Sequence, residues 1–199
     1  SGLADGIYYY NASANDTAGN NANLETRNIT LDNAVPGVTI NLPAYSGINL
    51  SVSSAGLNVT LNENGDSCLY SLNNGATNNS MTKNGNRDFN ATNLSIADGT
   101  YTVNYYCNDT AGNWNRTSSR AFGIDTIYPS IDYGAGTEND EATLSRTWIY
   151  VNVSISGDFS STIFTLFNTT GRVNESSYSD GTRTINWTGL PDGTYKYNA

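Results

Sequence analysis

This 199-residue sequence predicts an all-β protein made of tandem β-sandwich domains. Three observations predict that class: an internal repeat of domain length, apolar residues that alternate with polar ones, and turn signals at short intervals. Strand-forming Tyr, Val, Ile and Thr dominate over the helix formers Ala, Glu and Lys. No stretch of useful length shows the 3.6-residue period of a helix.

One phrase occurs three times along the chain. Residues 3–20 read LADGIYYYNASANDTAGN, residues 96–113 read IADGTYTVNYYCNDTAGN, and residues 190–199 read LPDGTYKYNA. The three copies are 93 and 94 residues apart (98 − 5 and 192 − 98), measured between their Asp-Gly pairs at Asp5, Asp98 and Asp192. A period of this length is a whole domain rather than one turn of a solenoid.

The period divides the chain into three parts. Residues 1–33 are expected to supply the sixth and seventh strands of an incomplete domain, residues 34–126 a complete domain, and residues 127–199 a domain without its last strand. A second landmark repeats at the same spacing, Asp32 with Pro36 and Asp125 with Pro129. Both termini are therefore expected to fall inside a domain.

Period-two alternation predicts the strands. Three lines of apolar residues show it: Leu57, Val59 and Leu61; Tyr101, Val103, Tyr105 and Cys107; Ile149, Val151, Val153 and Ile155. A polar face opposite each line is typical of an antiparallel sheet packed on one side only. The complete domain should hold seven strands, near residues 37–42, 48–52, 57–62, 67–72, 87–96, 100–108 and 114–124.

Seven strands in about 93 residues are typical of an immunoglobulin-like sandwich. The phrase that ends in Tyr101 resembles the tyrosine corner of that fold, and Tyr8 and Tyr195 hold the same place in the other copies. DGTYTVNYYCNDTAGN, followed by a strand ending FGIDTIYP, resembles the tandem immunoglobulin-like repeats of archaeal and bacterial cell-surface proteins. The resemblance covers essentially the whole chain and implies an extracellular location at the cell surface. It implies no particular activity, because the fold hosts many.

The two cysteines, Cys68 and Cys107, both lie on apolar faces of predicted strands. Both thiols are expected to point inward within one domain, where neighbouring or facing strands would allow a disulfide. The bridge would close a loop of about 40 residues and stabilise the domain by roughly 3–4 kcal/mol. A pair of buried free thiols is the alternative. Two Cys without any His argue against a zinc site.

Glycan acceptor triplets are in excess. With 30 Asn and 45 Ser plus Thr, random placement would give about 7 Asn-x-Ser/Thr triplets. Fourteen occur, at Asn11, Asn15, Asn28, Asn49, Asn58, Asn78, Asn90, Asn93, Asn108, Asn115, Asn152, Asn168, Asn174 and Asn186. The solvent face of a half-buried strand produces some polar-apolar-polar triplets without any glycan. Triplets in turns have no such origin, so several covalent N-glycans are expected.

Acidic residues near the repeat boundaries raise the question of calcium. Asp32 and Asp125 precede the Pro that opens each next domain, and Asp16 and Asp109 lie in the NDTAGN turns. Calcium takes six to eight oxygen ligands, whereas Asp in a turn caps its own backbone without a metal. No dense Asp-x-Asp run appears. We therefore expect no cofactor and keep calcium at the joints as an alternative.

No catalytic site is expected, and the protein is not predicted to be an enzyme. His is absent, which removes the commonest general base. No pair of carboxylates stands out for glycoside hydrolysis. The net charge of −9 argues against a nucleic-acid partner. No segment approaches the 18 consecutive apolar residues of a membrane helix.

The resemblance and the repeats together predict a structural subunit of an extracellular filament or cell-surface layer, archaeal by resemblance. Its partners would be copies of itself, assembled head to tail by donor-strand addition, in which N-terminal strands of one subunit complete the last sandwich of the next. Ile29 and Leu31 would be the inward-pointing residues of that polymerisation strand. An excerpt of a longer tandem surface protein is the alternative.

A carbohydrate-binding adhesin is the rival function from another class. Such a module displays exposed aromatic side chains, and four residues are candidates: Tyr9, Tyr106, Trp114 and Tyr150. Tyr and Trp also favour strands and interfaces, so the pattern alone does not favour a ligand.

Overall fold

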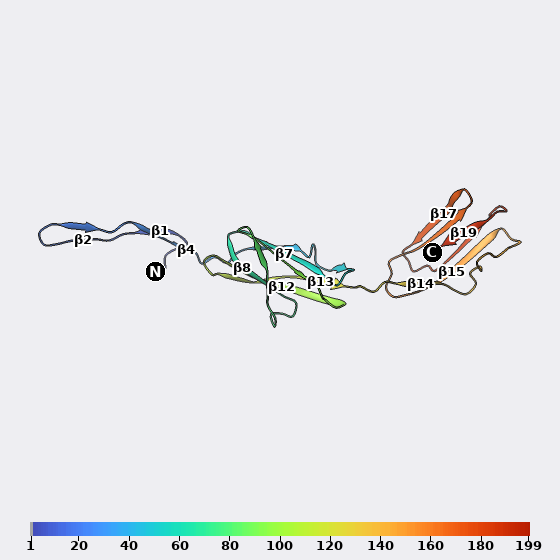
Figure 1. The fold of residues 1–199 in the computed structure, drawn as a ribbon, viewed down its shortest axis with the longest axis horizontal. Coiled ribbons are helices and arrows are strands. Elements are labelled where there is room, and N and C mark those ends of the chain that lie inside the picture. The colour runs from blue at the N-terminus through green and yellow to red at the C-terminus, as the bar shows by residue number, and fades with distance from the viewer. Residues whose placement is uncertain (1) are drawn as a thin grey trace. The chain divides into compact units, whose positions relative to one another are not determined.

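The computed structural model describes residues 2–199, apart from the side chain of Thr117. Every regular element among them is a β-strand, which confirms the all-β class (Figure 1). The chain forms two compact units, Ser1–Thr126 and Ile127–Ala199. The first unit holds an N-terminal hairpin and a middle sandwich; the second holds a smaller sandwich. No helix among the described residues is long and apolar enough to cross a membrane.

The N-terminal hairpin is two-stranded. Strand β1 (Gly6–Tyr10) pairs antiparallel with β4 (Arg27–Leu31), and the ribbon continues into β2 (Ser13–Asn15) paired with β3 (Asn21–Asn23). No residue of the described hairpin strands is buried.

The middle sandwich consists of two antiparallel layers (Figure 1). One sheet has the order β10-β11-β7-β5, and the other β6-β13-β12-β8-β9, in which β6 runs parallel to β13. The strands are β5 (Val38–Leu42), β6 (Ile48–Leu50), β7 (Ala55–Leu61), β8 (Gly65–Ser71), β9 (Asn79–Ser80), β10 (Thr82–Asn84), β11 (Asp88–Asn93), β12 (Gly99–Asp109) and β13 (Trp114–Ile124). All seven predicted strands are present within a few residues of their expected bounds, and β9 and β10 are additional.

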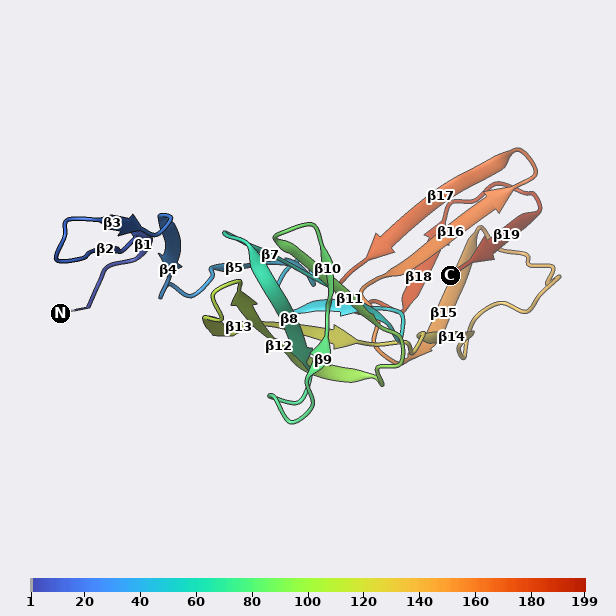
Figure 2. The same ribbon diagram turned by 60° about the vertical axis from the view of Figure 1, so that its left-hand side comes forward.

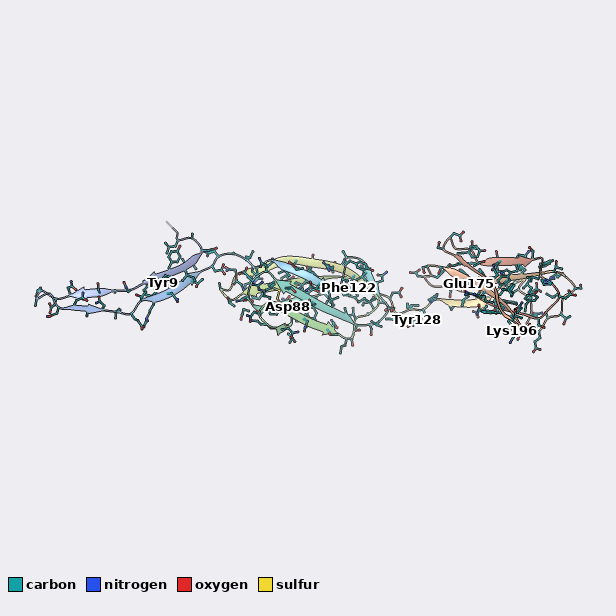
Figure 3. All side chains as sticks on the ribbon, turned by 90° about the horizontal axis from the view of Figure 1, so that it is seen from above. Tyr9, Asp88, Phe122, Tyr128, Glu175 and Lys196 are labelled. Atoms are coloured by element: carbon teal, nitrogen blue, oxygen red, sulfur yellow. A yellow bond between two sulfur atoms is a disulfide. The ribbon has the colours of Figure 1, made fainter. Side chains whose placement is uncertain are left out.

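The core of this sandwich follows the predicted alternation. Apolar side chains from both sheets are at most 1% exposed, among them Leu57, Val59, Leu61, Phe89, Val103, Tyr105, Cys107 and Phe122 (Figure 3 labels Phe122). The buried Tyr105 hydroxyl donates a hydrogen bond to the Leu42 carbonyl at 2.6 Å, so its polar end is satisfied. Burial raises the pKa of Tyr105 above its ordinary range.

The second unit has two three-stranded sheets, β14-β15-β18 and β17-β16-β19 (Figure 2). Its strands are β14 (Ser130–Tyr133), β15 (Trp148–Ser156), β16 (Thr162–Asn168), β17 (Gly171–Tyr178), β18 (Thr184–Thr188) and β19 (Tyr195–Asn198). Its buried apolar core is small and consists of Val151, Val153, Phe164, Leu166, Ile185 and Trp187.

A tyrosine corner closes all three copies of the repeated phrase. The Tyr8 hydroxyl donates to the Ala4 carbonyl at 2.8 Å, Tyr101 to Ala97 at 2.9 Å, and Tyr195 to Pro191 at 3.0 Å. Each bond spans four residues and ties the start of the sixth strand to the backbone before it. The three copies therefore share a hydrogen bond as well as their amino-acid sequence.

Candidate functional site

The disulfide joins two neighbouring strands of one sheet. Cys107 of β12 and Cys68 of β8 are directly opposite each other in the register and are bonded through their sulfur atoms, with 4.1 Å between their Cα atoms. Both side chains are at most 1% exposed. Since no free cysteine is found among the described residues, the bridge leaves no reactive thiol and is a structural link.

Three carboxylates meet at the end of the middle sandwich. Asp32 lies in the segment between the hairpin and β5, Glu63 in the turn between β7 and β8, and Asp109 at the end of β12. One carboxylate oxygen from each lies within 4.8 Å of the others. Two of the four Asp residues considered for calcium, Asp32 and Asp109, are thus brought together, whereas Asp16 lies in the hairpin turn.

Asp109 caps its own turn. Its carboxylate accepts hydrogen bonds from the backbone of Ala111 at 2.8 Å and of Asn113 at 2.9 Å, and from the Asn113 side chain at 2.8 Å. Asp16 makes the equivalent bonds to Ala18 and Asn20 in the hairpin. Burial acts to raise the pKa of Asp109, but these hydrogen bonds outweigh it and hold the pKa below its ordinary value. Turn capping accounts for both Asp residues.

Glu63 is the residue of the three-carboxylate cluster that could not be picked out from the sequence. Burial raises its pKa, and the negative charges of Asp32 and Asp109 raise it further, while Arg87 acts in the opposite direction. Three converging carboxylates offer hard oxygen ligands of the type that calcium prefers. The available sequence signal was the Asn-Glu-Asn-Gly turn at residues 62–65, which lies at the same sandwich end as the NDTAGN turn.

We expect Glu63→Gln to stabilise the middle sandwich in chelator at neutral pH, because it removes a like charge from the cluster. The gain should be about 0.5 kcal/mol, since the site is partly solvated. A carboxyl whose folded pKa is raised contributes stability below its unfolded pKa and loses it as pH rises through the folded pKa. The gain should therefore be present near pH 7 and absent near pH 4. Thermal unfolding at the two pH values measures it.

Glu141→Gln is the matched control, because Glu141 is exposed and belongs to the second unit. An equal gain in both variants would show that net charge, not the cluster, sets the effect. A wild-type midpoint that rises in millimolar Ca²⁺, while that of Glu63→Gln does not, would identify the cluster as a cation site.

Strand β16 of the second unit is only partly paired on the side of β19. The two strands pair from Thr165 to Asn168, and no described strand lies beside Thr162 on that side. Thr162 is 2% exposed, and its hydroxyl has no hydrogen-bond partner. A hollow of about 210 Å³ borders this stretch and is lined by residues including Pro129, Ile131, Ile155, Phe159, Ile163 and Ala199.

The two residues predicted for a polymerisation strand lie in β4 of the hairpin. Ile29 is 52% exposed, and Leu31 is partly buried. On the facing strand β1, Tyr10 is 56% exposed. The equivalent positions in the middle sandwich, Phe122 and Val103, are fully buried. Among the described residues, these hairpin positions are exposed or partly buried, whereas their copies in the middle sandwich are buried.

The fourteen acceptor triplets occupy unlike environments. Asn28 and Asn186 are exposed on strands β4 and β18. Asn108 is 7% exposed; its side-chain oxygen accepts bonds from the Ser67 backbone and hydroxyl. The Asn115 amide donates to the Pro36 carbonyl at 2.9 Å. Glycan transfer needs a free amide nitrogen with space around it. The folded protein should therefore accept a glycan at the exposed triplets and not at the buried ones.

We expect enzymatic transfer of a lipid-linked oligosaccharide to the folded protein to modify Asn28 and Asn186 at least about tenfold more than Asn108. The reason is burial of the Asn108 amide in a paired strand, where opening requires unfolding. Peptide mass spectrometry gives the occupancy. Reduced and unfolded protein is the control, and there Asn108 should become an acceptor. Comparable occupancy at Asn108 in the folded protein would contradict this assignment.

The four aromatic candidates for carbohydrate binding lie on four strands, β1, β12, β13 and β15, of which β12 and β13 are paired neighbours. Tyr9 is 70% exposed on the hairpin (Figure 3), whereas Tyr106, Trp114 and Tyr150 are half-buried. The Arg116 guanidinium lies over the Trp114 ring, 5.2 Å from its centroid, and occupies one face of that ring. None of the four lines the hollow that borders β16.

No family model matches the sequence. Over 97 residues the chain is 35% identical to halomucin of Haloquadratum walsbyi (strain DSM 16790 / HBSQ001). The match covers 49% of this chain and 1% of halomucin, so the chain spans a very small part of that relative.

Two solved structures align with the chain. The Clostridium thermocellum CbhA fibronectin(III)-like modules align with a TM-score of 0.48 and 14% identity, over 77% of this chain and 80% of that chain. A tetra-tandem repeat in the extending region of a large adhesion protein aligns with a TM-score of 0.39 and 18% identity, over 98% and 56% of the two chains. The chain itself is an all-β array of immunoglobulin-like sandwich modules.

Proposed function

We propose that this chain is a structural part of an extracellular cell-surface protein, in which repeated sandwiches form a glycosylated layer or filament through contacts between copies. The observation that carries the proposal is the repetition itself. Three successive copies of one phrase close with the same tyrosine-corner bond. Repeated modules supply length and stiffness, which are the properties that a wall or filament requires.

Three further features support the same role. The buried Cys68–Cys107 bridge belongs to an oxidising compartment. Exposed acceptor triplets such as Asn28 and Asn186 suit a glycosylated surface. The 35% identity to halomucin over 97 residues supports a place at the cell surface.

The test is the location and arrangement of the native protein. Antibodies against the middle sandwich, used with gold labels in electron microscopy, should mark an ordered layer or fibres outside the cell. Label confined to the cell interior would overturn the proposal. A glycan array probes the rival function: saturable binding that Tyr9→Ala abolishes would identify a carbohydrate-binding adhesin instead.

A further inference from the structure

We propose that Asn84, in the turn between β10 and β11, is a site of spontaneous deamidation that converts it to aspartate or isoaspartate. The inference goes beyond the proposed function, because it names a covalent modification that needs no enzyme. It follows from a comparison within the middle sandwich, where the same dipeptide occurs in three different settings. The three Asn-Gly pairs are Asn64-Gly65, Asn74-Gly75 and Asn84-Gly85.

Deamidation at an Asn-Gly pair begins with attack of the backbone on the side chain. The glycine amide nitrogen bonds to Cγ of the asparagine, the Cγ–Nδ2 bond breaks, and the proton of the glycine amide leaves with the side-chain nitrogen as ammonia. Water then opens the resulting succinimide ring. Opening at Cγ gives aspartate, and opening at the main-chain carbonyl gives isoaspartate, in which the backbone runs through Cβ and Cγ. Glycine favours the attack because it has no Cβ to obstruct it.

The attack requires a glycine amide that is free to approach Cγ, and Gly65 does not meet this requirement. Gly65 begins β8 and is buried. Its amide donates a hydrogen bond to the Asn86 carbonyl at 2.9 Å. The carbonyl of Gly65 accepts a hydrogen bond from Lys83 Nζ at 2.6 Å. The nitrogen of Gly65 can therefore reach Asn64 only after this end of β8 has opened.

The amide of Gly75 is also held. It donates a hydrogen bond to Ser71 Oγ at 2.8 Å, and Ser71 is fully buried. The same hydroxyl donates to Asn73 Oδ1 at 2.9 Å, which fixes its position. Attack on Asn74 would break the bond between Gly75 and Ser71 and leave a buried hydroxyl with one partner fewer.

The third pair differs in both respects. Asn84 is the last residue of β10, and both Asn84 and Gly85 are exposed. Among residues 2–199, the structure shows no hydrogen-bond partner for the Gly85 amide or for the Asn84 side chain. A Cβ built on Gly85 would meet no atom within 4 Å, so the space around the turn is open. Attack on Asn84 therefore breaks no hydrogen bond of Gly85.

The modification would change the edge of one sheet. Asn84 lies directly opposite Asp88 in the register, and Figure 3 labels Asp88. A carboxylate formed from Asn84 would place two negative charges opposite each other, which destabilises a strand pair. Isoaspartate would in addition lengthen the backbone of the turn. Strand β10 has three exposed residues and lies at the edge of its sheet, so it should loosen, whereas the buried Phe89 should stay packed.

Peptide mass spectrometry on the aged full chain tests the site. The folded protein is incubated in mildly alkaline buffer, and isoaspartate is detected separately by enzymatic methylation with a labelled methyl donor. Modification at Asn84 should accumulate at least about tenfold faster than at Asn64 or Asn74. In the reduced and denatured chain the three sites should react within about threefold of one another. Equal rates at the three sites in the folded protein would overturn the inference.

Two variants test the cause. Asn84→Gln should remove the fast isoaspartate signal, because attack on the longer side chain requires a six-membered ring; Asn86→Gln, in the same turn, is the matched control and should keep the signal.

Ser71→Ala removes the acceptor of the Gly75 amide and should raise the rate at Asn74 at least about threefold without changing that at Asn84. An unchanged rate at Asn74, or a fast signal that survives Asn84→Gln, would contradict the proposal. Thermal unfolding of each variant shows that the rates belong to folded protein.

Discussion

Phe89→Ala is expected to lower the free energy of unfolding of the middle sandwich by about 3–5 kcal/mol. Phe89 is fully buried on β11 and lies opposite Val59 in the register. Its ring packs so closely that a methyl group on Gly65 would lie 2.8 Å from Phe89 Cε2 and 2.5 Å from Leu61 Cδ1. Surroundings this tight collapse poorly around a cavity, so the cost should be near the upper end of the range.

Denaturant unfolding followed by amide hydrogen exchange on β7 and β11 measures this loss in the correct domain. Phe89→Leu, which keeps most of the volume, should cost about 1–1.5 kcal/mol and serves as the control. The second unit should keep its own stability, because its core is a separate cluster. Equal costs for the Ala and Leu variants would contradict the packing argument.

The double variant Cys68→Ala with Cys107→Ala is expected to cost the middle sandwich about 3–4 kcal/mol. The bridge closes a segment with a sequence separation of 39 residues, and its loss frees that segment in the unfolded chain. The free energy of unfolding of the variant and of wild type, each measured with and without reductant, gives the size of the effect. Reductant should destabilise wild type towards the variant and leave the variant unchanged.

The second unit is an internal control for this prediction. Its residue at the position of Cys68 is Thr162, and both cysteines of the chain lie in the first unit. Its unfolding should be insensitive to reductant. A loss below about 1 kcal/mol in the double variant would show that the unfolded chain is already restricted without the bridge.

Strand positions could be predicted because each strand has one buried face and one face towards solvent. Leu57, Val59 and Leu61 are buried, and Asn58 and Thr60 between them are half-exposed, as the alternation requires. The short strands β9 and β10 escaped notice because two or three exposed polar residues carry no alternation. They form only through pairing with β8 and β11, which is information about neighbours rather than local sequence.

The candidate sites were less accessible from sequence. Burial on apolar faces pointed to both cysteines, yet alternation could not say whether their strands were neighbours in one sheet or faced each other across the core. The cluster of Asp32, Glu63 and Asp109 joins residues from distant turns. Likewise, the unsatisfied hydroxyl of Thr162 depends on which strand lies beside β16. Proximity of this kind comes from topology, which single-sequence patterns do not encode.

The position of the disulfide has a mechanical consequence. When tension is applied through the two ends of the middle sandwich, the force passes through the disulfide between β8 and β12. The residues between the two cysteines are then not stretched. The 39-residue span from Cys68 to Cys107 cannot extend, which withholds roughly 130–140 Å of contour length from a stretched module. A module that unfolds under force therefore extends only through the residues that lie outside the span between the two cysteines. The enclosed strands remain tethered close together, ready to re-form once the pull is released.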